Sequence, residues 1–308
     1  MGVRQLIAGH SRLAAGVALV LLSVIWGYNW VILKVALRFS SPFTFAALRT
    51  ALATASLFMI LVALRRPLRP VKPLQLAWLG LLQTTGFIGC TMWALVSGAA
   101  GKTAVLTYTM PFWVIVFAKI VLGERMQSAQ KFAVTLAFLG LIMVLAPWQP
   151  QGDLKSNLIA VVAGIFWAAG TLYTKILRRQ QNFDLLSLTS WQMLFGAVGL
   201  IIIAALLPEP PVQWSGLFVG ALVYNVFLGN ALAWFLWLYA LDTLPAGVAS
   251  LGILATPVIG VVFAAVQLHE KPAPPEILGM LLIGLALLLI SVHAIRQHRR
   301  ISPTIGQE

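Results

Sequence analysis

Aromatic and amide side chains are the residues of this sequence that could bind a ligand. The chain has 11 tryptophans, and several of them fall with tyrosines and amides inside long apolar runs. Aromatic walls with a few polar groups are typical of small-molecule pockets, and they stack on aromatic ligands or attract organic cations. The alternative is that these residues only pack and hydrogen-bond neighbouring helices. The candidate binding residues are Trp26, Asn29, Trp30, Gln83, Tyr108, Trp113, Trp167, Tyr173, Tyr224 and Asn230.

Residues for proton, metal or phosphate chemistry are missing from the middle of these runs. All Asp, Glu and His residues fall at the ends of the runs or between them. A group that carries protons through a membrane would lie within a run with a shifted pKa. Glu124 and Glu270 come nearest, and the alternative for each is an ion pair with a neighbouring cation. The sequence has no phosphate-binding glycine loop with its lysine and no metal-ligand spacing. It therefore predicts no enzyme activity, no cofactor and no metal.

The composition places most of the chain in lipid. Hydrophobic residues make up 60% of the chain and charged residues 9%, and the mean hydropathy is +0.92. A soluble domain could not bury so much apolar surface. The runs have the length of membrane-spanning helices, roughly 20 residues, rather than of barrel strands. The predicted fold is an all-α membrane protein with ten transmembrane helices, at roughly residues 13–35, 43–64, 74–96, 101–121, 128–147, 157–177, 185–207, 216–239, 246–267 and 276–295.

Basic residues gather in alternate gaps between the predicted helices. If the N-terminus is cytoplasmic, the cytoplasmic gaps hold most of the cations, including Arg65, Arg66, Arg125, Lys131, Arg178 and Arg179. This bias predicts that both termini lie in the cytoplasm. It also accounts for the net charge of +13 without a nucleic-acid partner. The first run lacks a cleavage site at its end, so we expect it to be retained as a span.

The sequence contains an internal duplication. A shift of 146 positions aligns four pairs without a gap: Gly101 with Gly247, Pro111 with Pro257, Glu124 with Glu270, and Arg125 with Lys271. A shift of 141 aligns Trp26 with Trp167 and Lys34 with Lys175. Pro111 and Pro257 each remove a helical hydrogen bond and are predicted to kink their helices as hinges.

Five helices in each repeat would make the second repeat enter the membrane from the opposite side. Inverted repeats of this kind are typical of secondary transporters, with the substrate site between the halves. The predicted organisation is a cytoplasmic N-terminus (1–12), a first repeat (13–147), a linker (148–156), an inverted second repeat (157–295) and a cytoplasmic tail (296–308).

Three motifs of the first repeat resemble one known family. SVIWGYNWVILK, then SPFTFAALRTALA with Arg49, and the Pro111 run ending in LGER are similar to the EamA-type drug/metabolite transporter superfamily. The second repeat departs from this pattern, with Ser190 in the place of Arg49. The resemblance implies ten helices in two inverted repeats around a central cavity, which is lined by the first, third and fourth helices of each half. It ranks highest the candidates on those helices, namely Trp26, Asn29, Trp30, Tyr108 and Trp167.

The resemblance implies an exporter from the bacterial inner membrane. Within the family, the chain is most similar to exporters of amino acids, including aromatic ones. We therefore expect it to export small amphiphilic metabolites by alternating access. We also expect a monomer whose partners are a small-molecule substrate and the lipid bilayer. Because no proton carrier lies within a run, we expect a facilitator without proton coupling. The alternatives are a proton-coupled exporter of cationic or aromatic drugs, nucleosides or sugars, and, in another class, a membrane enzyme or lipid-handling protein.

Overall fold

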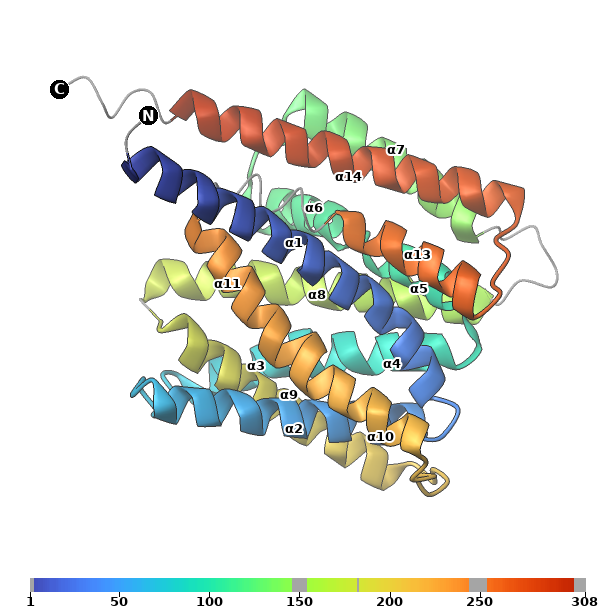
Figure 1. Cartoon of the computed structure of the whole chain (residues 1–308). Coiled ribbons are helices and arrows are strands. Elements are labelled where there is room, and N and C mark those ends of the chain that lie inside the picture. The colour runs from blue at the N-terminus through green and yellow to red at the C-terminus, as the bar shows by residue number, and fades with distance from the viewer. Residues whose placement is uncertain (1–2, 146–153, 182, 244–253, 302–308) are drawn as a thin grey trace.

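The computed structural model describes residues 3–145, 154–181, 183–243 and 254–301, and each element in these ranges is a helix (Figure 1). The first half of the chain forms α1 (Val3–Ala36), α2 (Pro42–Ala63), α3 (Pro73–Gly80), η1 (Leu81–Gly86), α4 (Phe87–Ser97), α5 (Ala100–Thr107), α6 (Met110–Leu122) and α7 (Ser128–Leu145). The second half forms α8 (Leu154–Gln180), α9 (Leu185–Leu206), α10 (Gly216–Val223), η2 (Tyr224–Leu232), α11 (Ala233–Thr243), α13 (Ala255–Gln267) and α14 (Pro274–Ile301).

Eight helical segments in these ranges are long and apolar enough to cross a membrane. Two shorter apolar helices, Gly216–Asn230 and Ala255–Gln267, occupy the positions of the eighth and ninth predicted spans. Part of the ninth predicted span, residues 246–253, lies outside the described ranges. The all-helical fold is confirmed for the described residues, and a total of ten membrane crossings stays a prediction.

The third and eighth predicted spans each contain a π-helical segment at the same place. η1 lies between α3 and α4, and η2 lies between α10 and α11. Leu81 and Tyr224, which begin the two segments, are 143 positions apart, and so are Gly86 and Gly229. π-Helical turns occur mostly as local insertions in α-helices, often at functional sites. The repeated position marks these two segments as a shared feature of both halves.

The fourth predicted span is divided into two helices just before Pro111. α5 ends at Thr107, α6 begins at Met110, and Pro111 lies in the first turn of α6. A proline is tolerated there because its missing N–H would have no partner within the helix. Pro257 lies close to the start of α13 in the same way. Whether either proline acts as a hinge stays a prediction.

Helices of the two halves pack against each other in matched pairs. α1 packs on α11 and α13, while α8 packs on α4 and α6. Exchanging the halves converts the first set of contacts into the second. α2 packs on α9, and α7 packs on α14. α1 and α8 run in opposite directions across the bundle (Figure 1).

Glycines set the closest of these approaches. A Cβ atom on Gly140 of α7 would lie 2.7 Å from the carbonyl oxygen of Gly279 in α14, and a Cβ on Gly279 would lie 2.5 Å from that of Gly140. Only glycine at both positions allows the two backbones to come this close. Small residues at helix contacts are typical of membrane bundles.

Candidate functional site

Three of the predicted candidates meet where α1 contacts η2. The Trp26 indole Nε1 donates a hydrogen bond to the Gly229 carbonyl oxygen at 3.1 Å. The Tyr224 hydroxyl donates to the Ile25 carbonyl oxygen at 2.7 Å. A Cβ atom on Gly229 would lie 3.6 Å from Asn29 Oδ1, so the Asn29 amide faces the η2 backbone. These contacts join a helix of the first half to one of the second.

A matching contact joins α8 to η1 and α4, again across the two halves. Gln83 of η1 packs against Gly170 of α8, where a Cβ atom would lie 2.8 Å from Gln83 Cβ. The Trp167 ring meets Phe87 edge to face, with 4.7 Å between ring centroids. Gly170 is 141 positions after Asn29, the same shift that relates Trp26 to Trp167. The two contacts are therefore repeat equivalents, with an amide in one and a glycine in the other.

Two further candidates lie on the fourth span and the helices around it. Trp30 of α1 is 7% exposed, and a Cβ atom on Gly260 of α13 would lie 3.2 Å from its ring. Tyr108 lies at the interruption between α5 and α6, packs on the same buried cluster as Trp30, and faces the Thr256 side chain of α13.

Trp113 and Tyr173 pack elsewhere in the bundle. Trp113 Nε1 donates to Thr109 Oγ1 at 3.2 Å, and its ring meets Phe138 of α7 edge to face at 5.1 Å. Tyr173 packs in a cluster formed by residues of α3 and α9. The structure therefore gives both of these candidates packing contacts, and a binding role for them stays a prediction.

Several buried polar atoms near these contacts have no hydrogen-bond partner within the described ranges. They include Oδ1 of Asn29, Asn225 and Asn230 on α1 and η2, and Oγ1 of Thr107 beside the interruption of the fourth span. Asn225 is 4% exposed. Buried polar groups normally have a partner, and exceptions call for an explanation such as water or a ligand. Thr107 was not among the predicted candidates. A hydroxyl within an apolar run most often bonds its own helix, so its residue type alone does not indicate a site.

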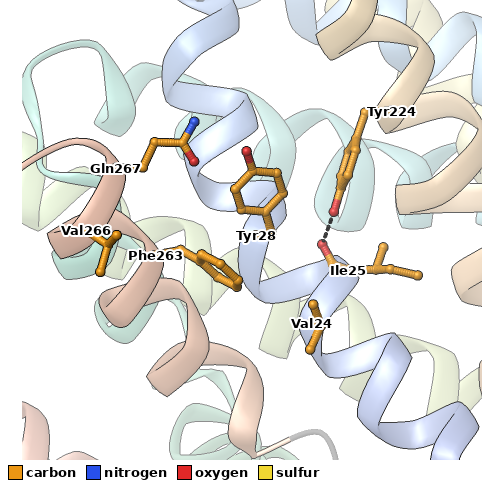
Figure 2. Close-up of a pocket in the computed structure, with 7 residues that line it drawn as sticks. All are labelled: Val24, Ile25, Tyr28, Tyr224, Phe263, Val266 and Gln267. Atoms are coloured by element: carbon orange, nitrogen blue, oxygen red, sulfur yellow. Dashed lines mark hydrogen bonds between the residues drawn. The ribbon is translucent and has the colours of Figure 1, made fainter.

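A pocket of about 680 Å³ lies between α1, η2 and α13 (Figure 2). Its lining residues are Val24, Ile25, Tyr28, Tyr224, Phe263, Val266 and Gln267. Tyr28 meets Tyr224 and Phe263 edge to face, with centroids 5.8 and 4.9 Å apart. Val266 is 69% exposed, so the pocket opens on the outer face of the bundle. Tyr224 is the predicted candidate that lines it, and the central cavity stays a prediction.

Charged side chains lie at the two ends of the bundle. At the end where α8 terminates, called here the α8 end, Glu124 Oε1 accepts from Lys175 Nζ at 2.7 Å and from Arg179 at 3.3 Å. The hydrogen bond from Lys175 lowers the pKa of the Glu124 carboxyl below its usual value. At the opposite end, where α1 terminates (the α1 end), Glu270 accepts from the backbone of α5. Both carboxylates are engaged at helix termini.

The chain matches the EamA-like transporter family over residues 14–146 and 154–292, so the family domain occurs twice. A protein of Bacillus subtilis named "Uncharacterized transporter YoaV" is 28% identical over 267 residues, which cover 85% of this chain and 91% of that protein. Proteins named "Probable amino-acid metabolite efflux pump" are 28% identical in Salmonella typhimurium and 26% identical in Escherichia coli. They cover 92% and 93% of this chain, and 96% and 97% of their own lengths.

A solved crystal structure has the same fold. It superposes with a TM-score of 0.62 over 92% of this chain and 98% of that chain, at 18% sequence identity. With the duplicated family domain and the eight apolar spans, this chain belongs to the EamA-like transporter family and is a multi-pass membrane transporter.

Proposed function

We propose that this protein exports small amphiphilic metabolites, first of all aromatic and apolar amino acids, by alternating access between two inverted five-helix repeats. It would act as a monomer in the bacterial inner membrane, with the α8 end and both termini on the cytoplasmic side and the α1 end outside. The bias of lysines and arginines in the gaps supports this orientation, and the opposite directions of α1 and α8 support the inversion of the second repeat.

The observation that carries the proposal is the position of the candidates between the repeats. Trp26 and Asn29 of the first repeat meet η2 of the second, and Trp167 of the second meets Phe87 of the first. Substrate sites of secondary transporters lie at such repeat interfaces, often where a helix is broken. Relative movement of the repeats would change both contacts together, which is what alternating access requires.

The chemistry of these contacts suits a molecule with an apolar body and a polar head. Indole and phenol rings offer stacking surfaces to an aromatic or aliphatic side chain. The amide oxygens of Asn29, Asn225 and Asn230, which have no partner among the described residues, can accept hydrogen bonds from an ammonium group. The names of the relatives from Salmonella and Escherichia support amino acids as the first class to test.

The proposed energy source is the gradient of the substrate itself. The acidic residues of the described ranges lie at or beside helix ends, namely Glu124, Asp184, Glu209, Asp242, Glu270 and Glu276. Proton carriers of membrane transporters are ionisable groups within the spans. A facilitator needs none.

Counterflow in proteoliposomes tests the proposal. Vesicles preloaded with unlabelled phenylalanine or leucine should take up the labelled amino acid at the same rate with and without an imposed pH gradient. No counterflow of any amino acid would exclude this substrate class. Uphill uptake driven by the pH gradient would exclude a facilitator and favour the proton-coupled alternative. Uptake of cationic aromatic drugs in the same assay would favour drugs, rather than amino acids, as the substrates.

Tryptophan variants test where the substrate binds. Trp26→Phe removes the donor to Gly229 but keeps an aromatic ring, and Trp167→Phe is its repeat equivalent. Each should raise the KM for phenylalanine by about 3- to 10-fold, the effect of one lost hydrogen bond or contact. Trp78→Phe is the control, since Trp78 on α3 is 56% exposed. Equal KM values in all three variants would contradict this placement of the site.

A further inference from the structure

The turn between α4 and α5 (residues 95–101, the α4–α5 turn) joins the last residues of one helix to the first of the next at the α1 end. Lys34 Nζ of α1 donates to the carbonyl oxygens of Leu95 at 2.6 Å, Val96 at 3.1 Å and Gly98 at 2.9 Å. The last carbonyls of a helix have no partner within it and carry partial negative charge. Lys34 therefore stabilises the C-terminus of α4.

Glu270 performs the complementary role at the other side of the turn. Its carboxylate accepts from the backbone N–H of Ala100 at 2.6 Å and of Gly101 at 3.0 Å. These are the first amides of α5, which lack intrahelical partners and carry partial positive charge. The connection is long in sequence, because Glu270 follows α13 in the second repeat.

Other residues of the second repeat bind the same segment. Ser156 of α8 donates to the Ala94 carbonyl oxygen at 2.7 Å and lies 2.9 Å from Ser97 Oγ. Lys102 of α5 forms an ion pair with Glu276 of α14, with side chains 14% and 10% exposed. A Cβ atom on Gly101 would lie 3.0 Å from the Val261 Cα of α13. The turn and the first residues of α5 thus contact α8, α13 and α14 of the second half.

The repeat equivalents of Lys34 and Glu270 behave differently. At the α8 end Lys175 binds the Glu124 side chain itself at 2.7 Å, and the two side chains are 45% and 41% exposed. At the α1 end, Lys34 and Glu270 therefore bind the backbone at helix ends. At the α8 end, their repeat equivalents Lys175 and Glu124 bind each other. Two related halves in different local states are what a transporter open toward one side at a time would contain.

We propose that the α4–α5 turn is the outer gate of this transporter and that Lys34 and Glu270 hold it closed. The inference rests on the proposed alternating access. When the second repeat moves relative to the first, Glu270, Ser156 and Glu276 leave the turn together, and the ends of α4 and α5 separate from α13. Because Glu270 binds backbone amides, its negative charge is required at that position, and Lys34 is required as a cation on the carbonyls.

A thiol placed behind the turn reports the gate without knowledge of the substrate. Thr103 lies on α5 just after the turn and is 1% exposed. In a Cys90→Ala background, Thr103→Cys should react slowly with a membrane-impermeant thiol reagent added outside. Adding Glu270→Gln or Lys34→Met should raise the labelling rate by about 10- to 100-fold, as expected from the loss of charge-assisted hydrogen bonds.

A charge exchange separates binding of helix ends from a simple ion pair. The double variant Lys34→Glu/Glu270→Lys places a negative charge on the C-terminus of α4 and a positive charge on the N-terminus of α5, so labelling at position 103 should be as fast as in the single variants. The matched control Lys175→Glu/Glu124→Lys keeps its side-chain pair, so labelling should stay at the slow rate. Slow labelling in the first double variant would overturn the proposal, and so would slow labelling in monodisperse, folded Glu270→Gln and Lys34→Met proteins.

A reversible lock tests the same gate in a protein that has already folded. Ser97→Cys/Ser156→Cys in the Cys90→Ala background places two thiols where the hydroxyl oxygens are 2.9 Å apart. Oxidation should stop both counterflow and outside labelling of a third cysteine at position 103, and reduction should restore both. Fast labelling of the oxidised protein would overturn the gate. Loss of amino-acid counterflow already in the reduced parent would instead count against the proposed substrates, while labelling still reports the gate.

Discussion

Glu209 is predicted to stabilise the bundle by capping a helix from a distant part of the chain. It lies between α9 and α10, and its carboxylate accepts from the Thr44 hydroxyl at 2.6 Å, the Thr44 N–H at 2.9 Å and the Phe43 N–H at 3.3 Å. Phe43 and Thr44 are in the first turn of α2. Ser41, the N-cap residue of that helix, makes no side-chain capping bond. Glu209 supplies the anion that the start of α2 lacks.

The expected magnitude follows from these three contacts. Hydrogen bonds to a charged group contribute roughly 1.5–3 kcal/mol each in partly buried sites, but they share one carboxylate and are not additive. Glu209→Ala should therefore lower the free energy of unfolding by about 2–4 kcal/mol, in the range of a lost buried cap or network. Glu209→Gln keeps an acceptor oxygen and should cost roughly half as much.

Thermal unfolding of the purified protein in detergent measures the effect. Glu124→Ala is the matched control, because it removes a carboxylate from an exposed pair worth about 0–1 kcal/mol. Glu209→Ala should lower the unfolding temperature by at least twice the shift of Glu124→Ala, with Glu209→Gln between them. Equal shifts in Glu209→Ala and Glu124→Ala would refute the capping argument.

Two further predictions concern helix contact and pH. Gly196→Ala in α9 should destabilise the bundle by about 1–3 kcal/mol, because the new Cβ would lie 2.2 Å from Thr84 Cβ. Gly216→Ala is the control, since its Cβ would meet no atom of the described residues within 4 Å. Similar unfolding temperatures for the two variants would contradict this packing. The folded-state pKa of Glu124 is lowered by Lys175, so their pair stabilises the fold above the unfolded-state pKa and this contribution is lost as the pH falls through the folded-state pKa. Lys175→Met should therefore lower stability at neutral pH by at most about 1 kcal/mol, and the difference from the parent should shrink below pH 4.5; a difference that grows on acidification would contradict the sign.

The sequence predicts the helices but not which face of each helix packs against a neighbour. Runs such as the one around Trp113 are apolar on all sides, so periodicity does not indicate which side meets another helix. Trp113 and Tyr173 were predicted, like Tyr224, as aromatic residues within apolar runs. The structure packs Trp113 against α7 and Tyr173 against α3 and α9, and a binding role for either stays a prediction. The repeat shift did identify Trp26 and Trp167 as equivalents, and both lie at contacts between the halves.

The sequence by itself determined the membrane environment, the helical class and the duplication. These follow from composition, run length and repeated spacing, which are local properties of the chain. Only the tertiary structure decided that Pro111 lies in the first turn of α6 after an interruption and that Glu270 caps α5 from 170 positions away. The sequence shows that a carboxylate such as that of Glu270 lies at a helix end, where a positively charged partner would stabilise it. Whether that partner is the neighbouring cation in the sequence or the N-terminus of a distant helix depends on how the repeats pack. That packing is set by backbone approach at glycines such as Gly140 and Gly279, which no single segment encodes.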